Sequence, residues 1–201
     1  HRAPAGGPRG AAPTAGALPL GASGVGADGS GAIPTAASQA TTVAGIYAIG
    51  DVIGKSDLTP VAIAAGRRLA DRVFGGMKER KLDYENIATV LFTHPPIGSI
   101  GLTEQQAVKT HGAANVKVYE SRFTPMYYAF TRRKVKCTMK LVVAGEMEKI
   151  VGGHVIGPGA DERRPGFAGA VRLCATKRAL AATVSIHAPT PLRPAPAAGP
   201  R

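Results

Sequence analysis

The sequence predicts an α+β fold in which an antiparallel sheet flanked by helices follows a shorter α/β segment. Short runs rich in β-branched and aromatic residues are grouped between positions 88 and 156, and helical patterns lie beside and after them. A separate strand-turn-helix pattern occupies positions 45–73. Strands that are grouped in this way favour an antiparallel sheet over an alternating parallel one.

The strand-turn-helix pattern at positions 45–73 is the clearest local signal. A run of β-formers ends at the pair Gly50-Asp51, and we expect a helix that begins with Thr59 as N-cap and Pro60 at its first position. Its expected core face comprises Ala62, Ala65, Leu69 and Val73. Such a helix N-terminus suits an anionic or electron-rich ligand, with Asp51 holding a hydroxyl-bearing part. The alternative is an ordinary connection with a solvated Asp51.

Composition narrows the classes of partner. The 201 residues carry a formal charge of +12, which is typical of proteins that bind nucleic acid or an anionic membrane surface. The basic residues are dispersed with few aromatic neighbours, so we expect no nucleic acid partner. No apolar run approaches the roughly 20 residues that span a bilayer, so we expect no membrane association.

The two cysteines, Cys137 and Cys174, are far apart and lack metal-ligand spacing. We expect reduced, partly buried thiols, no metal site and a cytoplasmic compartment. A mitochondrial or plastid location stays open, because a transit peptide would precede His1.

From residue 82 onward the pattern predicts the elements of the sheet. We expect strands at 88–93, 115–122, 136–144 and 149–156, the last two forming a hairpin around Gly145. Thr103 and Gln106 have capping-box spacing, which predicts a helix to about His111 that ends at Gly112. A second helix is expected over most of 166–175, with one face formed by Phe167, Ala170, Val171 and Cys174. We expect this helix to start late, because Pro165 would interrupt an earlier start.

The stretches 45–52 and 58–62 resemble the second flavin-binding motif of the flavoprotein disulfide reductases (class-I pyridine nucleotide-disulfide oxidoreductases). In that family a strand ending in Gly-Asp meets the ribityl chain of FAD. The resemblance implies that Asp51 contacts the ribityl chain and that Leu58 and Thr59 contact the flavin ring.

Four further stretches resemble the dimerisation domain of this family, and of its glutathione reductase branch in particular: 94–104, 123–127, 137–142 and 149–154. The resemblance implies an FAD- and NADPH-dependent reductase of glutathione disulfide that works as a homodimer or pairs with a full-length subunit. It also implies that Met126 and Tyr127 face the partner's glutathione disulfide pocket. The alternative for both residues is an apolar plug in a dimer interface.

The segment Ser185-Ile186-His187 resembles the place of the family's cross-subunit histidine, so the resemblance implies that His187 is the catalytic acid and base. The orienting glutamate of the family would fall at Leu192, which cannot accept a hydrogen bond. This departure favours a rival interpretation as a non-catalytic dimerisation module or degenerate remnant. A third possibility is a reductase for another disulfide.

The sequence contains no CxxxxC pair, no GxGxxG and no second Gly-rich unit for NADPH. We therefore expect the C-terminal part of such a reductase, without turnover of its own. The expected organisation is a partly disordered lead-in (1–40), a remnant of the FAD-binding domain (41–80), the dimerisation domain (81–187) and an Ala/Pro-rich tail (188–201).

Overall fold

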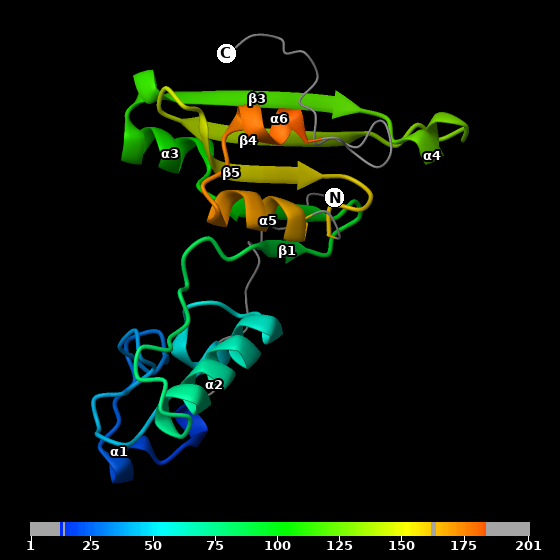
Figure 1. The fold of residues 1–201 in the computed structure, drawn as a ribbon. Helices are drawn as coiled ribbons and strands as arrows, with labels where there is room; N and C mark the ends of the chain where they lie inside the picture. The colour runs from blue at the N-terminus through cyan, green and yellow to red at the C-terminus, as the bar shows by residue number, and fades with distance from the viewer. Residues whose placement is uncertain (1–12, 14, 162–163, 184–201) are drawn as a thin grey trace. The chain divides into compact units, whose positions relative to one another are not determined.

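A computed structural model describes residues 13, 15–161 and 164–183, and the chain divides into two compact units, 1–84 and 85–201. The first unit contains η1 (Ala15–Ala17), α1 (Leu20–Ser23), η2 (Gly50–Ile53) and α2 (Thr59–Val73). Its small apolar core is formed by Ala15, Val25, Ile33, Ala48 and Ile53. Figure 1 shows α2 as the longest helix of this unit.

The strand expected before Gly50 does not form a named strand in the structure. Tyr47 makes a single antiparallel bridge with Ala40, and the backbone at Ile49 is extended with φ −140° and ψ 164°. A strand is defined by a ladder of hydrogen bonds to a neighbour, and the described residues around this segment supply only that bridge. The local extended conformation was therefore predicted correctly, but its assignment as a strand was wrong.

The start of α2 differs from the expectation by one residue. Leu58 is the N-cap, with an extended backbone whose carbonyl accepts hydrogen bonds from the amides of Val61 and Ala62, and the Thr59 hydroxyl makes no cap bond. Proline is tolerated throughout the first turn, so Pro60 did not fix the boundary. Of the expected core face, Ala65 is completely buried and Val73 is 40% exposed, so the buried face does not extend to the end of the helix.

The second unit is built on a five-stranded antiparallel sheet in the order β1-β2-β5-β4-β3. The strands are β1 (Thr89–Leu91), β2 (Ile97–Gly101), β3 (Val116–Phe123), β4 (Cys137–Ala144) and β5 (Lys149–Ile156). The predicted α+β class and the β4–β5 hairpin are confirmed. The sequence did not predict β2, in which two of five residues are glycine.

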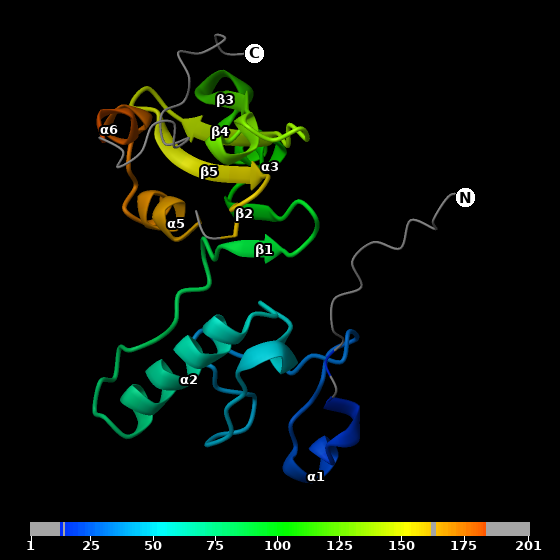
Figure 2. The ribbon, with the colours of Figure 1, turned by 90° about the vertical axis from the view of Figure 1, so that its right-hand side faces the viewer.

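Two layers of side chains cover the sheet. On one face Cys137, Met139, Leu141 and Val143 of β4 pack with Phe167 and Val171 of α5 (Arg164–Arg172). The helix α6 (Lys177–Ala182) lies on the same face, and α3 (Glu104–His111) lies on the opposite one, as Figure 2 shows. Alternate residues of β4 therefore face different helices, as the pleat of a strand requires.

The helix boundaries agree with the sequence prediction at α3 and differ from it at α5. The capping box at Thr103 and Gln106 is present, and α3 ends before Gly112 as predicted. The helix α5 begins at Arg164, so the expected late start is wrong; Pro165 lies in the first turn, where a backbone donor is not needed. The same helix ends at Arg172, and Cys174 follows it with φ 51° and is exposed, so its expected place on one face of this helix and its expected partial burial are wrong.

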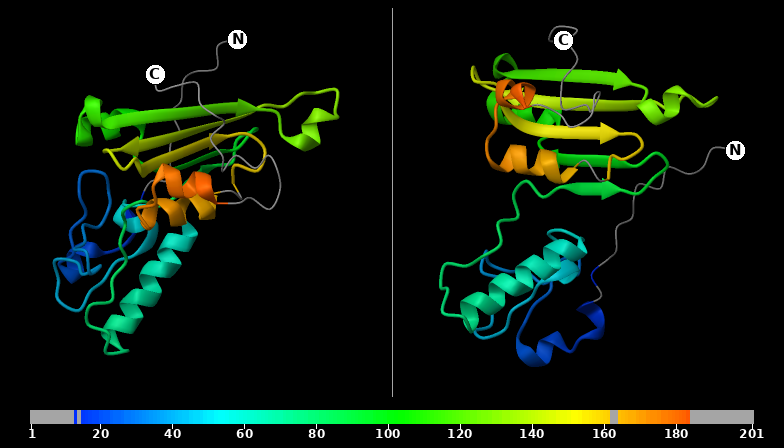
Figure 3. Two further views of the ribbon diagram at one scale, coloured as in Figure 1. Left: turned by 45° about the horizontal axis from the view of Figure 1, so that its top comes forward. Right: turned by 45° about the vertical axis from the view of Figure 1, so that its right-hand side comes forward.

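Two short elements complete the unit. The 3-10 turn η3 (Ala113–Asn115) leads into β3, and α4 (Met126–Ala129) follows it. Figure 3 shows α4 beyond the ends of β3 and β4, at the end of the sheet opposite to α3. This position places the connection between β3 and β4 at the surface.

Candidate functional site

The flavin-motif residues lie on a turn that packs against α2. Gly50 has φ 76°, and a Cβ atom at this position would lie 3.4 Å from the Cβ atom of Ala62. Asp51 follows in η2 and is exposed, and its carboxylate has no hydrogen-bond or ion-pair partner among the described residues. The glycine thus allows the close approach of the turn to the helix and leaves the carboxylate available to a ligand.

The residues at the start of α2 fit the same kind of ligand. Leu58 is half-buried at the N-cap, and Thr59 is exposed at the first helical position. The first amides of a helix carry partial positive charge, which favours an electron-rich ring or an anionic group. Asp51 can accept a hydrogen bond from a hydroxyl group, so this turn and the start of α2 offer a ligand one acceptor and one partly positive helix end.

An arginine braces α2, and the sequence analysis missed it. The guanidinium of Arg72 donates to Oε1 of Gln39 at 3.4 Å, to the carbonyl of Arg80 at 2.8 Å and to the carbonyl of Ser38. Gln39 is 1% exposed and has φ 60°. This network ties the far end of α2 to the turn that precedes Ala40, across 33 residues of sequence, so no local motif could reveal it.

The predicted substrate contacts lie at the surface of α4. Met126 is 58% exposed and Tyr127 is 77% exposed, and the Tyr127 ring makes an edge-on contact with Tyr128 at a centroid distance of 5.1 Å. Neither side chain is among those that line the hollows beside the sheet described below. Their position is open to a ligand or to another chain.

His187 lies outside the described residues, and α6 is the last described helix before it. The start of α6 is fixed to the β4–β5 turn, because the amide of Lys177 donates to the carbonyl of Glu148 at 2.9 Å. The Lys177 ammonium lies 4.0 Å from Oε2 of Glu148 and 4.0 Å from the centroid of the Tyr119 ring. Three elements therefore meet at this carboxylate.

The Glu148 carboxylate also has two close partners on β3. The Tyr119 hydroxyl donates to Oε1 at 2.7 Å, and the Lys117 ammonium lies 3.0 Å from the same oxygen. Hydrogen bonds from Tyr119 and Lys117 lower the pKa of Glu148. Burial, together with the hydrogen bond to the carboxylate, raises the pKa of Tyr119 to about 12. The phenol therefore stays protonated and the carboxylate stays ionised at neutral pH.

His154 forms a second polar link, between β5 and the end of β2. Its Nδ1 lies 2.6 Å from the Ser99 hydroxyl, and its Nε2 lies 3.1 Å from the carbonyl of Leu102. A carbonyl only accepts, so Nε2 carries the proton and Nδ1 accepts from Ser99 in the neutral ring. A Cβ atom at Gly152 would lie 2.0 Å from the Leu102 oxygen, so only glycine permits this approach.

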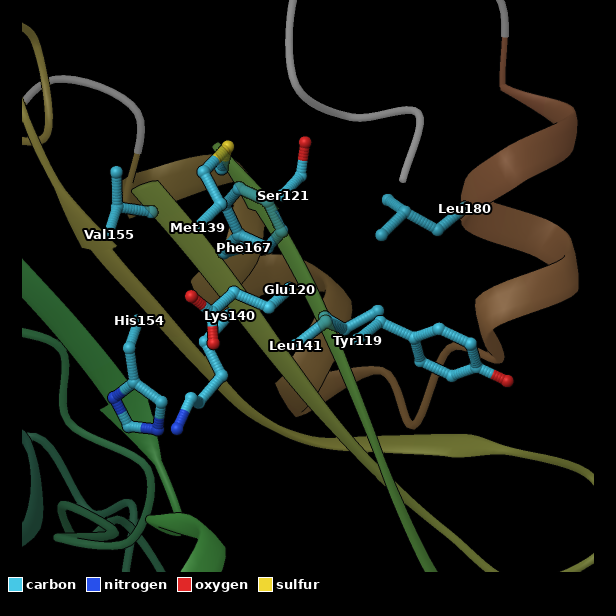
Figure 4. Close-up of a pocket in the computed structure, with 10 residues that line it drawn as sticks. All are labelled: Tyr119, Glu120, Ser121, Met139, Lys140, Leu141, His154, Val155, Phe167 and Leu180. Carbon is cyan, nitrogen blue, oxygen red and sulfur yellow. The ribbon is translucent and has the colours of Figure 1, made fainter. Parts of the chain in front are cut away.

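The described residues line a small and a larger hollow beside the sheet. Figure 4 shows the smaller one, of about 30 Å³, where Leu180 of α6 and Phe167 of α5 approach β4 and Tyr119. That volume accommodates about one water and excludes a cofactor. The larger hollow, of about 580 Å³, is open on the α3 side and is lined in part by Glu104, Lys140 and His154. Lys140 and Glu104 are paired at 3.0 Å across it.

The described ranges contain no group of three His, Cys, Asp or Glu side chains arranged to hold a metal ion. Among the helices of these ranges, none has the length and apolar character needed to cross a membrane.

Comparisons with known proteins agree with this architecture. Residues 87–192 match the family model described as pyridine nucleotide-disulphide oxidoreductase, dimerisation domain. The chain is 44% identical over 180 residues to a glutathione reductase of Schizosaccharomyces pombe; the match covers 89% of this chain and 39% of that protein. The chain therefore spans about two fifths of the length of this curated relative.

Solved structures show the same fold. A Cu(II) complex of the HOCl-induced flavoprotein disulfide reductase RclA from Escherichia coli superposes with a TM-score of 0.80 at 21% identity, covering 91% of this chain and 42% of that one. A second RclA structure gives a TM-score of 0.76 at 20% identity, covering 92% and 42%. From the family match over more than half of its length, the chain belongs to the pyridine nucleotide-disulphide oxidoreductases, and residues 87–192 are its dimerisation domain.

Proposed function

We propose that this chain is the C-terminal part of a glutathione-disulfide reductase and supplies the dimerisation domain together with the end of the flavin-binding domain. The observation that supports this most strongly is the 44% identity to a glutathione reductase over 180 residues. That match is longer than either compact unit, so it includes residues of both. The function therefore draws on the Gly50-Asp51 turn as well as on the sheet.

In the whole enzyme, one NADPH and one proton reduce one glutathione disulfide to two glutathiones, and the electrons travel through FAD and a redox dithiol. This chain contributes Asp51 as acceptor for a ribityl hydroxyl and Leu58 and Thr59 at the flavin ring. Met126 and Tyr127 lie against the disulfide substrate in the partner's pocket. NADPH binds to another part of the enzyme, and the redox dithiol also belongs to another part.

His187 is the proposed acid and base, which protonates the leaving thiolate across the dimer interface. Leu192 stands where the family's orienting glutamate would be, so the imidazole lacks a carboxylate to fix its tautomer. We therefore propose a weaker acid-base function at this position than an oriented histidine would have.

The chain does not turn over by itself under this proposal. Neither of its two cysteines forms a disulfide, and Cys137 is completely buried in the sheet, so they cannot act as the exchanging dithiol. The test is to incubate the purified chain with FAD, desalt it, record the visible spectrum and assay NADPH-driven reduction of glutathione disulfide. We expect no turnover; a flavin band that persists together with activity would contradict the proposal.

A second candidate is a non-catalytic dimerisation module that pairs with a full-length reductase. The presence of Leu192 in place of the family's glutamate favours this module, because an enzyme under selection for turnover would need a carboxylate at this position. The two candidates differ in the reading frame upstream of His1: an in-frame CxxxxC and GxGxxG would support the reductase, and stop codons would support the module. In either case two cysteines that form no disulfide are consistent with a cytoplasmic compartment, with mitochondrion and plastid as alternatives.

A further inference from the structure

The connection between β3 and β4 carries an unusual combination of exposed side chains. We define the α4 tip as residues 126–136. Met126, Tyr127 and Phe130 expose 58%, 77% and 89% of their surface. Arg132, Arg133 and Lys136 are also exposed and make no ion pair with another described side chain. Apolar and cationic groups are therefore presented together.

The charge of the α4 tip is not balanced locally. No aspartate or glutamate occurs between Glu120 and Glu146, a stretch that holds six arginines and lysines. Of these six, Lys140 is paired with Glu104. The tip projects beyond the ends of the strands (Figure 1), and no carboxylate among the described residues of its unit forms an ion pair with Arg132, Arg133 or Lys136. An anion near this surface meets an uncompensated positive potential.

Hydrogen bonds within the tip hold these groups in one structure. The Thr131 hydroxyl lies 3.0 Å from the carbonyl of Tyr128 and 2.7 Å from that of Arg133. The ammonium of Lys134 donates to the carbonyl of Ala129. Lys134 and Thr131 therefore fold the chain after α4 back onto the helix, so the cations lie next to the apolar side chains.

We propose that Arg132, Arg133 and Lys136 recognise the carboxylates of an anionic peptide disulfide, while the apolar side chains of the same tip contact its disulfide. The inference rests on the proposed function and extends it to the charged ends of the substrate. Each half of oxidised glutathione carries two carboxylates on either side of a polarisable sulfur. Sulfur packs favourably on aromatic rings, and guanidinium groups bind carboxylates in a planar, two-point geometry.

A nucleic acid is the competing ligand for the α4 tip, because it is also anionic and its bases stack on aromatic rings. A nucleic-acid groove tracks the backbone with a continuous stripe of cations over several elements. The other exposed cations of this unit, such as Lys109, Lys149 and Arg178, are instead dispersed over α3, β5 and α6. The small, isolated tip fits a small anion better, and the experiment below includes both.

The test is a titration of the isotope-labelled chain with oxidised glutathione, followed by backbone amide shifts. We expect the shifts to map to residues 126–136 and the affinity to fall with added salt. The variant R132Q/R133Q/K136Q retains Lys134 and should bind about tenfold more weakly, since each exposed pair contributes about twofold. The matched control K109Q/K149Q/R178Q removes three exposed cations elsewhere in the unit and should change affinity by less than about twofold.

The tetraester of oxidised glutathione, which lacks the carboxylates, should also bind about tenfold more weakly. The proposal is overturned if the wild-type chain does not bind, if R132Q/R133Q/K136Q binds as well as wild type, if the shifts map elsewhere, or if a short oligonucleotide occupies the tip in preference. Self-association of the same samples tests the proposed dimerisation independently, so a chain that dimerises without binding would refute this inference and leave the proposed function standing.

Discussion

The Tyr119 hydroxyl donates a hydrogen bond to Oε1 of Glu148 at 2.7 Å, which joins the edge strand β3 to the turn between β4 and β5. The same carboxylate forms ion pairs with Lys117 and Lys177. The backbone carbonyl of Glu148 accepts a hydrogen bond from the amide of the first residue of α6. One side chain at a turn therefore organises three elements. Because the Glu148 side chain is only 21% exposed, solvent screens its ion pairs only in part.

Replacement of this carboxylate should make stability less dependent on pH. The pKa of Glu148 is lowered in the folded state, so its contribution is present above its ordinary pKa and is lost as pH falls through the folded value. We expect Glu148→Gln to cost about 1–2 kcal/mol of unfolding free energy at neutral pH, because hydrogen bonds to a charged acceptor are lost. Urea unfolding at neutral and at acidic pH measures the difference, which should shrink in acid.

Tyr119→Phe removes the other partner of the hydrogen bond between Tyr119 and Glu148. The pKa of Tyr119 is raised to about 12, so its contribution persists below the ordinary value near 10 and is lost as pH rises through about 12. Equal losses for Glu148→Gln at neutral and strongly acidic pH would show that the carboxylate charge is not what stabilises this junction.

The approach of Gly152 to Leu102 predicts a severe effect of a single methyl group. A Cβ atom at Gly152 would lie 2.0 Å from the Leu102 carbonyl oxygen, and backbone cannot move aside as a flexible side chain can. We expect Gly152→Ala to destabilise the unit by about 3 kcal/mol or more. Gly169→Ala is the control, since nothing lies within 4 Å of its added Cβ and α5 should gain roughly 0.5–1 kcal/mol. Thermal unfolding of the two variants should shift in opposite directions, and a shift in the same direction would contradict the packing described here.

The layer between β4 and α5 predicts a large cost for truncation of Leu141. Its side chain is 7% exposed and belongs to the cluster that includes Phe167 and Val171. Leu141→Ala should lower the unfolding free energy by about 2–5 kcal/mol through lost burial and the cavity that remains. Met147→Ala, at a position that is 60% exposed in the turn, should change it by less than about 0.5 kcal/mol. Similar losses for both variants, measured by denaturant unfolding, would place Leu141 outside the core.

Local signals explain which elements could be predicted from the sequence. The capping box of Thr103 and Gln106 involves residues three apart, and α3 has the predicted start and end. Strand β5 has the predicted bounds because its neighbouring turn and its β-branched residues agree. By contrast, β2 contains two glycines and is stabilised by pairing with β5, more than 50 residues away, so no local pattern indicates it.

The same distinction applies to the candidate sites. Asp51 and Thr59 belong to a contiguous sequence motif, and the structure places them on a turn and a helix that touch. Their roles with FAD, and those of Met126 and Tyr127, stay predictions. The Arg72 brace and the Glu148 junction connect residues 33 and 29 positions apart, so only the fold brings them together.

Self-association of the chain tests the central claim most directly, because a dimerisation domain must pair. Sedimentation velocity over a range of micromolar concentrations should give a species with about twice the 20.5 kDa mass of the chain. A species with the mass of one chain at the highest concentration would contradict the assignment of this chain as the dimerising part of a disulfide reductase.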